Sequence, residues 1–350
     1  MEKKYKRLWI ATISGLAGCL VLIAGYVIVL DPFYSYHMPL FGWEAQNWDE
    51  TYCNPGLMRH LEYDSALVGT SMTEQFRASE ASQVMGGTYI KIKRSGGTSL
   101  DIARMIEALR EANPEMKNII LGMDINILRK SSNEYRSEMP EYIWDRNYLN
   151  DVSYWYNQDV LFKFSYALYS NNKNGTIMSL DDSFIIPPEK YGKEIALQEY
   201  SRPKEKDQSD KEAEWLEKGR ANLDNILSAI AGEPEIHYDV FIPPYSILYW
   251  DQRVRTNTLE AEYALQEDML KRLFACPNVT VHYFMDCEEI ITDLENYKDA
   301  GHYDSAVSSE LLNYMKSGEK IVTEENYVQV LDAWFSYVQS HDYEQYFAEE

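Results

Sequence analysis

Three residues from opposite ends of the sequence have the types needed for nucleophilic catalysis. Ser71 stands in a Gly-Thr-Ser triplet after an apolar run, and Asp299 precedes His302 by three positions near the C-terminus. A serine hydroxyl becomes a strong nucleophile when an imidazole takes its proton, and the imidazole needs a carboxylate on its other nitrogen. An Asp and a His at this spacing can come from one loop. We therefore predict that Ser71 is the nucleophile, His302 the general base and Asp299 the carboxylate that orients it.

Two further segments contain candidates for stabilising the oxyanion of an acyl-transfer reaction. Gly96 and Gly97 lie in a Ser-Gly-Gly-Thr turn, where the lack of side chains lets backbone N–H groups approach an anion. Asp124 and Asn126 follow the apolar run at 118–122. An ionised carboxylate only accepts hydrogen bonds, so Asp124 would repel an oxyanion. Three alternatives stay open: Asn126 donates in its place, Asp124 is protonated, or Asp124 orients another group.

Each of these motifs also has a structural interpretation. Ser71 could cap a following helix, His302 could cap a helix or lie on the surface, and Gly96 and Gly97 could form an ordinary turn. The other five histidines are interpreted as structural, and His282 is expected to face solvent from a strand. No metal-site spacing and no phosphate-binding glycine loop occur in the sequence, so we expect no cofactor and disfavour phosphoryl transfer.

The elements that position these residues alternate in type along the chain. The hydrophobic pattern predicts strand 65–69, a helix near 72–85, strand 88–93, helix 99–112 and strand 118–122. Strands that alternate with helices are typical of a parallel, doubly wound sheet, whose active sites lie beyond the carboxyl ends of the strands. We therefore expect an α/β fold in which Ser71, the glycine turn and Asp124 meet at one edge of the sheet.

The same alternation resumes after a long interruption. Residues 130–215 are rich in Tyr, Trp, Asn and Asp, and we interpret them as an inserted cap region. The later elements are predicted as helix 209–231, strand 236–243, helix 258–275, strand 279–284, and helices 304–317 and 323–341. The predicted domains are an anchor at 1–30, an extended collar at 31–60, and an α/β domain at 61–350 that carries the insertion.

The N-terminus has the features of a membrane anchor. Residues 10–30 contain no charged side chain, and at ~1.5 Å per residue they span roughly 31 Å, the thickness of a hydrocarbon core. The basic segment MEKKYKR precedes them, which favours a cytoplasmic N-terminus and an extracytoplasmic body at the cell membrane. A cleaved signal peptide is one alternative, but no cleavage site is clear. Lipidation of Cys19 is another, disfavoured because apolar residues continue after it.

Charge and cysteine content narrow the classes of partner. The 350-residue chain carries a formal charge of −23, and a body this acidic repels the phosphates of nucleic acids, so no nucleic-acid partner is expected. The four cysteines show no paired spacing, which argues against a disulfide scaffold and against a cysteine metal site. The acidity is interpreted as a means of keeping the body soluble.

The chemical motifs, taken in chain order, resemble those of the SGNH/GDSL hydrolases. They are Gly-Thr-Ser, a glycine turn after the second strand, an acidic residue after the third strand and Asp-x-x-His near the C-terminus. The membrane anchor makes the chain similar to the DltD- and AlgJ-like proteins. The segments DPFYSYHMPLF, ALVGTSMTEQF, FIPPYSILYWD and NYKDAGHY also resemble an anchored clostridial group of such proteins, and the resemblance covers about residues 31–320. The family usually has Asn where this chain has Asp124.

The resemblance implies both a site and a function. Ser71, His302 and Asp299 would form a catalytic triad, and the N–H groups of Ser71 and of Gly96 or Gly97 would bind the oxyanion. The chain would then be an extracytoplasmic serine esterase or O-acyltransferase that acts on cell-envelope polysaccharide or teichoic acid, beside a membrane-bound O-acyltransferase. The alternative is a catalytically inactive accessory or binding protein for such a system, which the acidic residue after the third strand keeps open.

Overall fold

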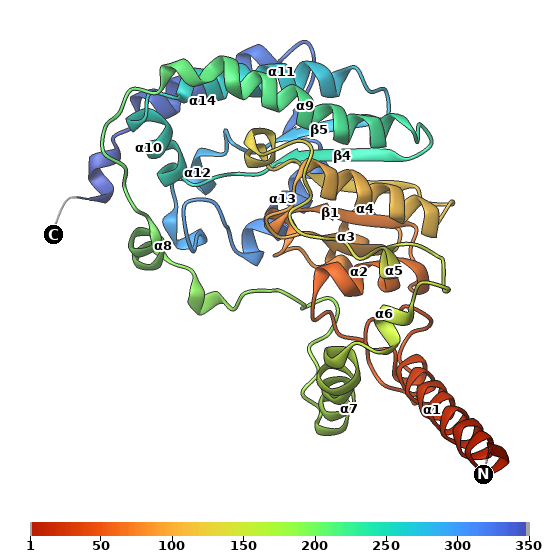
Figure 1. The fold of residues 1–350 in the computed structure, drawn as a ribbon. Helices are drawn as coiled ribbons and strands as arrows, with labels where there is room; N and C mark the ends of the chain where they lie inside the picture. The colour runs from red at the N-terminus through yellow and green to blue at the C-terminus, as the bar shows by residue number, and fades with distance from the viewer. Residues whose placement is uncertain (1, 348–350) are drawn as a thin grey trace. The chain divides into compact units, whose positions relative to one another are not determined.

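A computed structural model describes residues 2–347 and separates the chain into two units (Figure 1). The first unit contains the N-terminal part up to Leu61 together with Met139–Ser183, and the second unit contains the remainder. The segment 130–215, interpreted above as one insertion, is therefore divided. Its central part belongs to the unit of the anchor and collar, and its two flanks belong to the α/β unit.

The first unit begins with α1 (Glu2–Leu30), a helix that is long and apolar enough to cross a membrane. Its side chains are exposed over most of its length, and burial is concentrated in its last turns, where Val27 is fully covered. An apolar helix without a protein core along most of its surface is typical of a segment that lipid surrounds.

The remaining helices of the first unit are short. They are α2 (Glu50–His60), α5 (Glu141–Trp144), α6 (Val152–Trp155), the π-helix η3 (Asp159–Phe164) and α7 (Ser165–Asn174). The collar was expected to be extended, but α2 occupies its second half even though a Pro-Gly pair lies inside that helix. The helix tolerates the proline because the carbonyl of Thr51, which loses its helical donor, accepts Nε1–H of Trp144 at 2.9 Å instead. Gly56 packs against the chain at Phe33 and Tyr34. A Cβ at this glycine would lie 2.4 Å from each of their carbonyl oxygens.

A six-stranded sheet forms the centre of the second unit. Its strands are β1 (Ser65–Gly69), β2 (Tyr89–Lys93), β3 (Asn118–Gly122), β4 (His237–Ile242), β5 (Val279–Tyr283) and β6 (Ile321–Val322). They lie in the order β2-β1-β3-β4-β5-β6, all parallel except β6. The prediction of an α/β fold on a mainly parallel sheet is thus confirmed. The direction of winding reverses between β1 and β3, and such a reversal leaves a crevice at the carboxyl ends of the two strands.

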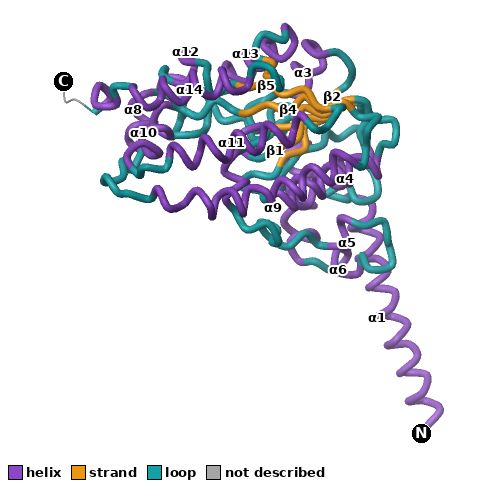
Figure 2. The backbone as a smooth tube through the Cα atoms, turned by 90° about the horizontal axis from the view of Figure 1, so that it is seen from above, coloured by secondary structure: helices purple, strands orange, loops and turns teal. Residues whose placement is uncertain are grey.

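Helices cover both faces of this sheet. The helices of the second unit are α3 (Ala78–Met85), α4 (Ser99–Ala112), α8 (Lys193–Glu199), α9 (Glu212–Ala231), α10 (Ile247–Arg255), α11 (Leu259–Phe274), α12 (Glu288–Ile291), α13 (Ser305–Ser317) and α14 (Tyr327–Ser340). Short helical turns are η1 (Ser71–Thr73), η2 (Ile125–Arg129), η4 (Pro188–Lys190), η5 (Ser209–Lys211), η6 (Leu294–Asn296) and η7 (Tyr343–Tyr346). Figure 2 shows α4 and α9 on one side of the strands and α3 and α13 on the other.

The two-sided cover explains one wrong prediction about the sheet. His282 was expected to face solvent from β5, but it is 1% exposed, and its Nε2 lies 2.9 Å from Oδ1 of Asp239 on β4. In a parallel sheet with helices on both faces, alternation along a strand does not separate an inner face from an outer face. The helix expected near 72–85 also differs, because it is divided into η1 and α3.

Two glycines at neighbouring strand ends make room for the turn after β1. Gly69 and Gly122 end the adjacent strands β1 and β3, and Thr73 packs against both. A Cβ at Gly69 would lie 2.5 Å from Cγ2 of Thr73, and a Cβ at Gly122 would lie 2.6 Å from the same atom. The Thr73 side chain is held in place because its hydroxyl donates to the carbonyl of Thr70 at 2.9 Å. The absence of side chains at both strand ends therefore sets the position of η1.

Gly122→Ala is expected to destabilise the protein. The new methyl group would also meet Cζ of Phe241 at 3.0 Å, so the buried side chains around it would have to move. Overpacking of this kind costs ~1–3 kcal/mol of unfolding free energy. Gly232→Ala is a matched control, because its Cβ would meet nothing nearer than 3.5 Å. Thermal unfolding in detergent compares the two variants, and equal stability of both would contradict the packing described here.

Candidate active site

Ser71 lies at the turn that follows the central strand β1. The strand ends at Gly69, and Thr70 caps η1 by accepting the N–H of Met72 on its side-chain oxygen at 3.3 Å. The serine is the first residue of this short helix, at the carboxyl end of the sheet, and it stays partly exposed. Its hydroxyl is therefore accessible while buried neighbours fix its backbone.

Asp299 and His302 come from a closed loop between η6 and α13. Tyr297 and Tyr303 form an antiparallel bridge across the base of the loop, and the N–H of Lys298 donates to the carbonyl of His302 at 3.1 Å. Pairing at the base makes the loop resemble a small hairpin. The two predicted catalytic side chains thus belong to a segment with few conformations available to it.

The turn after β4 anchors the same loop from outside. The carbonyl of Ala300 accepts the N–H of Ser246 at 3.2 Å and the hydroxyl of Ser246 at 2.8 Å. The hydroxyl of Tyr297 donates to the carbonyl of Pro244 at 2.8 Å. The loop therefore takes its position from the carboxyl end of β4, a neighbour of β3 in the sheet.

The structure brings the three predicted catalytic side chains into one hydrogen-bonded chain. Nε2 of His302 lies 2.8 Å from Oγ of Ser71. On the other side of the ring, Nδ1 of His302 lies 2.8 Å from Oδ2 and 3.0 Å from Oδ1 of Asp299. With the proton of the neutral ring on Nδ1, Nε2 is free to accept the serine proton. This is the arrangement that activates a serine in acyl transfer.

The environment keeps the carboxyl group of Asp299 ionised. Burial by itself would raise its pKa, but the hydrogen bond and charge attraction of His302 outweigh this effect, together with the backbone N–H groups of His302 and Gly301. Those two N–H groups donate to Oδ1 at 2.9 Å and 2.8 Å. The net result lowers the pKa of Asp299 to about 2. The carboxylate is therefore charged near neutral pH and can stabilise an imidazolium on its neighbour.

A second contact, next to the Ser71–His302 bond, supports the turn η1 that carries Ser71. The hydroxyl of Tyr303 donates to the carbonyl of Met72 at 2.5 Å. Met72 follows Ser71 and Tyr303 follows His302, so this bond lies next to the Ser71–His302 bond. Tyr303 is 2% exposed. Two parallel links between the same segments restrict rotation of one relative to the other.

Asp124 is occupied by three donors from the chain itself. Its Oδ2 accepts the hydroxyl of Thr70 at 3.0 Å, and its Oδ1 accepts the N–H of Asn126 at 2.9 Å and the hydroxyl of Tyr245. Thr70 is the residue that caps the nucleophile turn. These contacts fit the third alternative raised by the sequence, in which Asp124 orients other groups.

Asn126 is also held by its neighbours. Its amide nitrogen donates to the hydroxyl of Tyr245 at 3.1 Å, and its carbonyl oxygen accepts from Arg129 and, at 3.1 Å, from the hydroxyl of Tyr249. Arg129 in turn pairs with Glu262, whose side chain is fully buried. The side chain of Asn126 therefore serves a polar network that supports Tyr245, and these contacts do not favour a role as oxyanion donor.

The structure distinguishes the two glycines of the predicted oxyanion turn. The N–H of Gly97 donates to the carbonyl of Arg94 at 2.8 Å, so it closes the turn and is not available to an oxyanion. Of the two glycines that the sequence left open as donors, this contact favours Gly96. Gly96 has a φ of +65°, in the left-handed region that favours glycine. The turn lies beside β1, because the N–H of Arg94 donates to the carbonyl of Gly69 at 2.9 Å.

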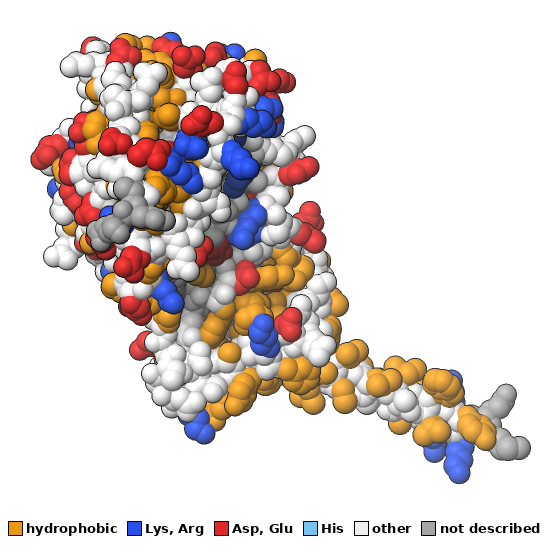
Figure 3. Space-filling view, turned by 90° about the vertical axis from the view of Figure 1, so that its left-hand side faces the viewer, with side chains coloured by type: hydrophobic (Ala, Val, Ile, Leu, Met, Phe, Trp, Pro, Cys, Tyr) orange, Lys and Arg blue, Asp and Glu red, His pale blue; other side chains and the backbone are white. Residues whose placement is uncertain are grey.

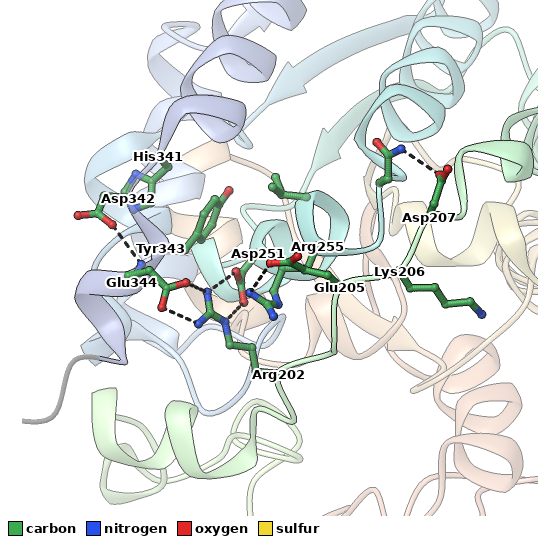
Figure 4. Close-up of a pocket in the computed structure, with 12 residues that line it drawn as sticks. Arg202, Glu205, Lys206, Asp207, Asp251, Arg255, His341, Asp342, Tyr343 and Glu344 are labelled. Carbon is green, nitrogen blue, oxygen red and sulfur yellow. Dashed lines mark hydrogen bonds and ion pairs between the residues drawn. The ribbon is translucent and has the colours of Figure 1, made fainter.

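A pocket of about 610 Å³ lies elsewhere in the second unit, and its lining among the described residues includes no member of the triad (Figure 4). Arg202 crosses it, donating to Asp251 at 2.9 and 3.1 Å and to Glu344 at 2.6 and 3.0 Å. Its charge is therefore already matched by two carboxylates. We interpret the pocket as the place where Arg202 links the segment 200–208 to Asp251 on α10 and Glu344 on η7 by hydrogen bonds.

Comparison with known proteins adds no family to this geometry. No protein-family model matches the sequence, and no curated protein matches it. The assignment of the site therefore rests on the positions and contacts of the residues themselves.

Three supporting residues were missed by sequence reasoning. Thr70 is the middle residue of the Gly-Thr-Ser triplet, and threonine is a preferred N-cap residue, so its capping role could have been predicted. Tyr245 follows a Pro-Pro pair at the end of β4, where the strand-end rule could have pointed to it. Tyr303 follows His302 directly, but a tyrosine beside an apolar helix reads as ordinary core, and no sequence signal marks its contact with Met72.

The lowered pKa of Asp299 predicts a pH-dependent contribution to stability. A carboxyl group whose folded pKa is depressed stabilises the folded state above its unfolded pKa, near 3.8, and loses that effect as pH falls through about 2. Asp299→Asn should therefore lower the unfolding free energy at pH 5, and the difference from the native chain should shrink as the pH falls below about 4. Denaturant unfolding at several pH values measures this. A difference that grows as the pH falls from 5 to 2 would contradict the assignment.

Loss of the Asp124 carboxylate should weaken both the fold and the nucleophile turn. Asp124→Ala leaves the buried hydroxyls of Thr70 and Tyr245 without this acceptor, and each unpaired buried donor costs ~1–3 kcal/mol. Tyr245→Phe removes one donor together with its need for an acceptor, so its effect should be smaller. Thermal unfolding ranks the two variants. An Asp124→Ala variant as stable as Tyr245→Phe would mean that Asp124 does not organise these residues.

Proposed function

We propose that this chain is a serine acyl-transfer enzyme of the SGNH-hydrolase type, working as an esterase or an O-acyltransferase. The observation that carries the proposal is the continuous chain from Ser71 through His302 to Asp299, with 2.8 Å on each side of the imidazole. These three side chains lie beyond the carboxyl ends of the parallel strands, near the reversal of winding between β1 and β3. Both the residue types and their place in the sheet fit nucleophilic catalysis.

The reaction proceeds in two halves through an acyl-serine intermediate. Oγ of Ser71 attacks the carbonyl carbon of an acyl ester or thioester while Nε2 of His302 takes its proton, and Asp299 stabilises the imidazolium. Collapse of the tetrahedral intermediate breaks the bond to the leaving group, which receives the proton from His302. An acceptor hydroxyl or water then gives its proton to His302 and attacks the acyl carbon. As this second tetrahedral intermediate collapses, the bond to Oγ of Ser71 breaks and His302 returns the proton to Oγ.

Backbone N–H groups are the proposed donors to the oxyanion. The N–H of Ser71 stands at the start of η1, where helical N–H groups have no acceptor within the helix. The N–H of Gly96 comes from the neighbouring turn beyond β2. Two such donors would act on the charge that develops in the transition state. The side chains of Asp124 and Asn126 act indirectly, by fixing Thr70 and Tyr245.

The membrane helix and the family resemblance extend the proposal to location and substrate. The basic residues in the first turns of α1 favour a cytoplasmic N-terminus and an extracytoplasmic body. An acyl-transfer enzyme held there meets cell-envelope polysaccharide or teichoic acid as acceptor and a membrane-bound O-acyltransferase as a neighbour. These substrates and this partner rest on the resemblance to the DltD- and AlgJ-like proteins.

The proposed topology predicts the behaviour of C-terminal fusions. Alkaline phosphatase requires an oxidising compartment, so its fusion after Glu350 should be active in cells, whereas a fluorescent protein that folds only in the cytoplasm should stay dark there. Moving the four basic residues from the N-terminal side of the apolar stretch 10–30 to its C-terminal side serves as the control and should reverse both signals. Activity of the cytoplasmic reporter on the unaltered chain would overturn the topology.

An inactive accessory protein on the same scaffold is the second candidate. The observation that favours it is Asp124, which stands where related enzymes usually have an amide donor and which accepts hydrogen bonds from the chain. A fluorophosphonate probe distinguishes the two candidates, because it reacts with activated serines. Labelling of a folded preparation at Ser71 supports the enzyme, and a folded preparation that takes no label supports the accessory protein.

The triad predicts strongly non-additive effects of mutation. Ser71→Ala and His302→Ala should each reduce turnover of a small acyl ester by about 10⁴-fold or more, and the double variant should be little worse than either, because the two residues act as one unit. Ser228→Ala, on the exposed side of α9, is a control that should keep full turnover. Steady-state kinetics on all four variants test this. Losses that simply add, or near-normal turnover of Ser71→Ala, would exclude the triad.

A further inference from the structure

Residues 139–183 lie alongside the membrane helix within the first unit. The hydroxyl of Tyr156 donates to the carbonyl of Leu20 at 3.0 Å, and both α6 and α7 pack against α1. Leu20 is not near the end of α1. At ~1.5 Å per residue, its carbonyl lies about 15 Å along the helix axis from Leu30. The segment that was interpreted from sequence as part of a cap therefore reaches halfway down the anchor.

The position of the lipid along α1 is closely constrained. Arg7 is the last charged residue before the apolar stretch, and Asp31 is the first after it. A hydrocarbon core of ~30 Å needs ~20 helical residues, so nearly the whole interval between these two charges must lie in it. Leu20 is consequently near the middle of the membrane, and a side chain that reaches it must pass through one leaflet.

A buried carboxylate holds the end of the anchor and the insertion together. Asp31 is fully buried and accepts the N–H of Ser35 at 3.0 Å, the N–H of Tyr36 at 2.7 Å and the hydroxyl of Tyr154 at 2.7 Å. Tyr154 belongs to α6, within the insertion. These bonds make a stiff joint, because the anchor can swing away from the insertion only by leaving buried hydrogen-bonding groups without partners.

The insertion carries a stripe of exposed apolar side chains on one helical face. Phe162, Tyr166 and Tyr169 follow one another at helical spacing through η3 and α7, with 72%, 64% and 42% of their surface exposed. Val152 and Leu149 nearby are 52% and 89% exposed. Figure 3 shows hydrophobic side chains continuing from the protruding helix onto the adjoining surface. Large exposed apolar patches of this kind mark a contact surface.

We infer that η3 and α7 insert into the membrane leaflet next to the C-terminal end of α1, with the Phe162–Tyr169 face against lipid acyl chains. We assign lipid as the cover of this face because the patch is continuous with α1. The inference rests on α1 as a membrane span. Helices satisfy their own backbone hydrogen bonds, as a lipid environment requires. Lys163 and Lys173 can extend their charges to the headgroups along their apolar stems. The protein is thus held at the membrane by two elements.

Quenching by lipid-borne nitroxides tests this inference on the full chain. Cys19 and Cys276 are replaced by Ala, which leaves only the buried Cys53 and Cys287. A single cysteine is then introduced by Phe162→Cys, labelled with bimane and reconstituted in phosphatidylcholine vesicles that contain doxyl lipids. Val21→Cys, 70% exposed on α1, is the control for contact with lipid. Ser228→Cys, exposed on α9, is the control for contact with water.

The expected result is quenching of the Phe162→Cys label similar to that of Val21→Cys and several-fold stronger than that of Ser228→Cys. Quenching no stronger than that of Ser228→Cys would overturn the inference and would leave a protein partner as the cover of this face, because the vesicles contain no other protein. Failure of the Val21→Cys label to be quenched would also overturn it, since α1 would then lie outside the lipid. Neither outcome depends on the reactivity of Ser71, so the proposed function is tested separately.

Discussion

The hydrogen bond between Ser71 and His302 is the constraint that the other contacts of the second unit have to meet. It joins two residues that are 231 positions apart in the chain at a distance of 2.8 Å. Such a bond weakens within a few tenths of an ångström, so it cannot by itself hold two long segments in place. The glycines at the ends of β1 and β3 fix one side, and the bridged loop before α13 fixes the other. The Ser71–His302 bond therefore forms only when both segments are held in place.

Two acidic side chains close to Ser71 have different roles, and their surroundings determine the role of each. Asp299 shares its charge with one imidazole and two backbone N–H groups, and its lowered pKa keeps it ready to stabilise an imidazolium. Asp124 accepts two hydroxyls and an N–H, all from buried or partly buried neighbours. Its side-chain oxygens hold Thr70 and the residues around it in place. An acidic residue near a proposed oxyanion site is thus compatible with catalysis when other donors of the chain occupy it.

Much of the fold could be predicted because strong local patterns agree with the final structure. Helix 99–112 was predicted with the bounds that α4 has, since its apolar spacing, the capping Thr98 and the terminal Asn113-Pro114 all agree. The five parallel strands were found from their apolar runs. Strand-end residues could be grouped because parallel strands share one carboxyl edge.

The parts that could not be predicted depend on contacts between distant segments. The short strand β6 and the buried position of His282 are decided by neighbours far away in sequence. The commitment of the Gly97 N–H to Arg94 requires the turn geometry, which a Ser-Gly-Gly-Thr sequence leaves open. The link from Tyr303 to Met72 crosses 231 positions without any local signal. The reach of Tyr156 to Leu20 along the anchor is a similar case.

If the proposed mechanism is right, Ser71 carries the acyl group during the reaction. Acid quenching of the purified chain early in its reaction with a small acyl ester, followed by mass spectrometry of the peptides, detects this intermediate. We expect a mass gain equal to the acyl group on the peptide that contains Ser71, absent from the Ser71→Ala variant. Turnover of the ester with no acylated peptide, or with the acyl group on a different residue, would exclude Ser71 as the nucleophile.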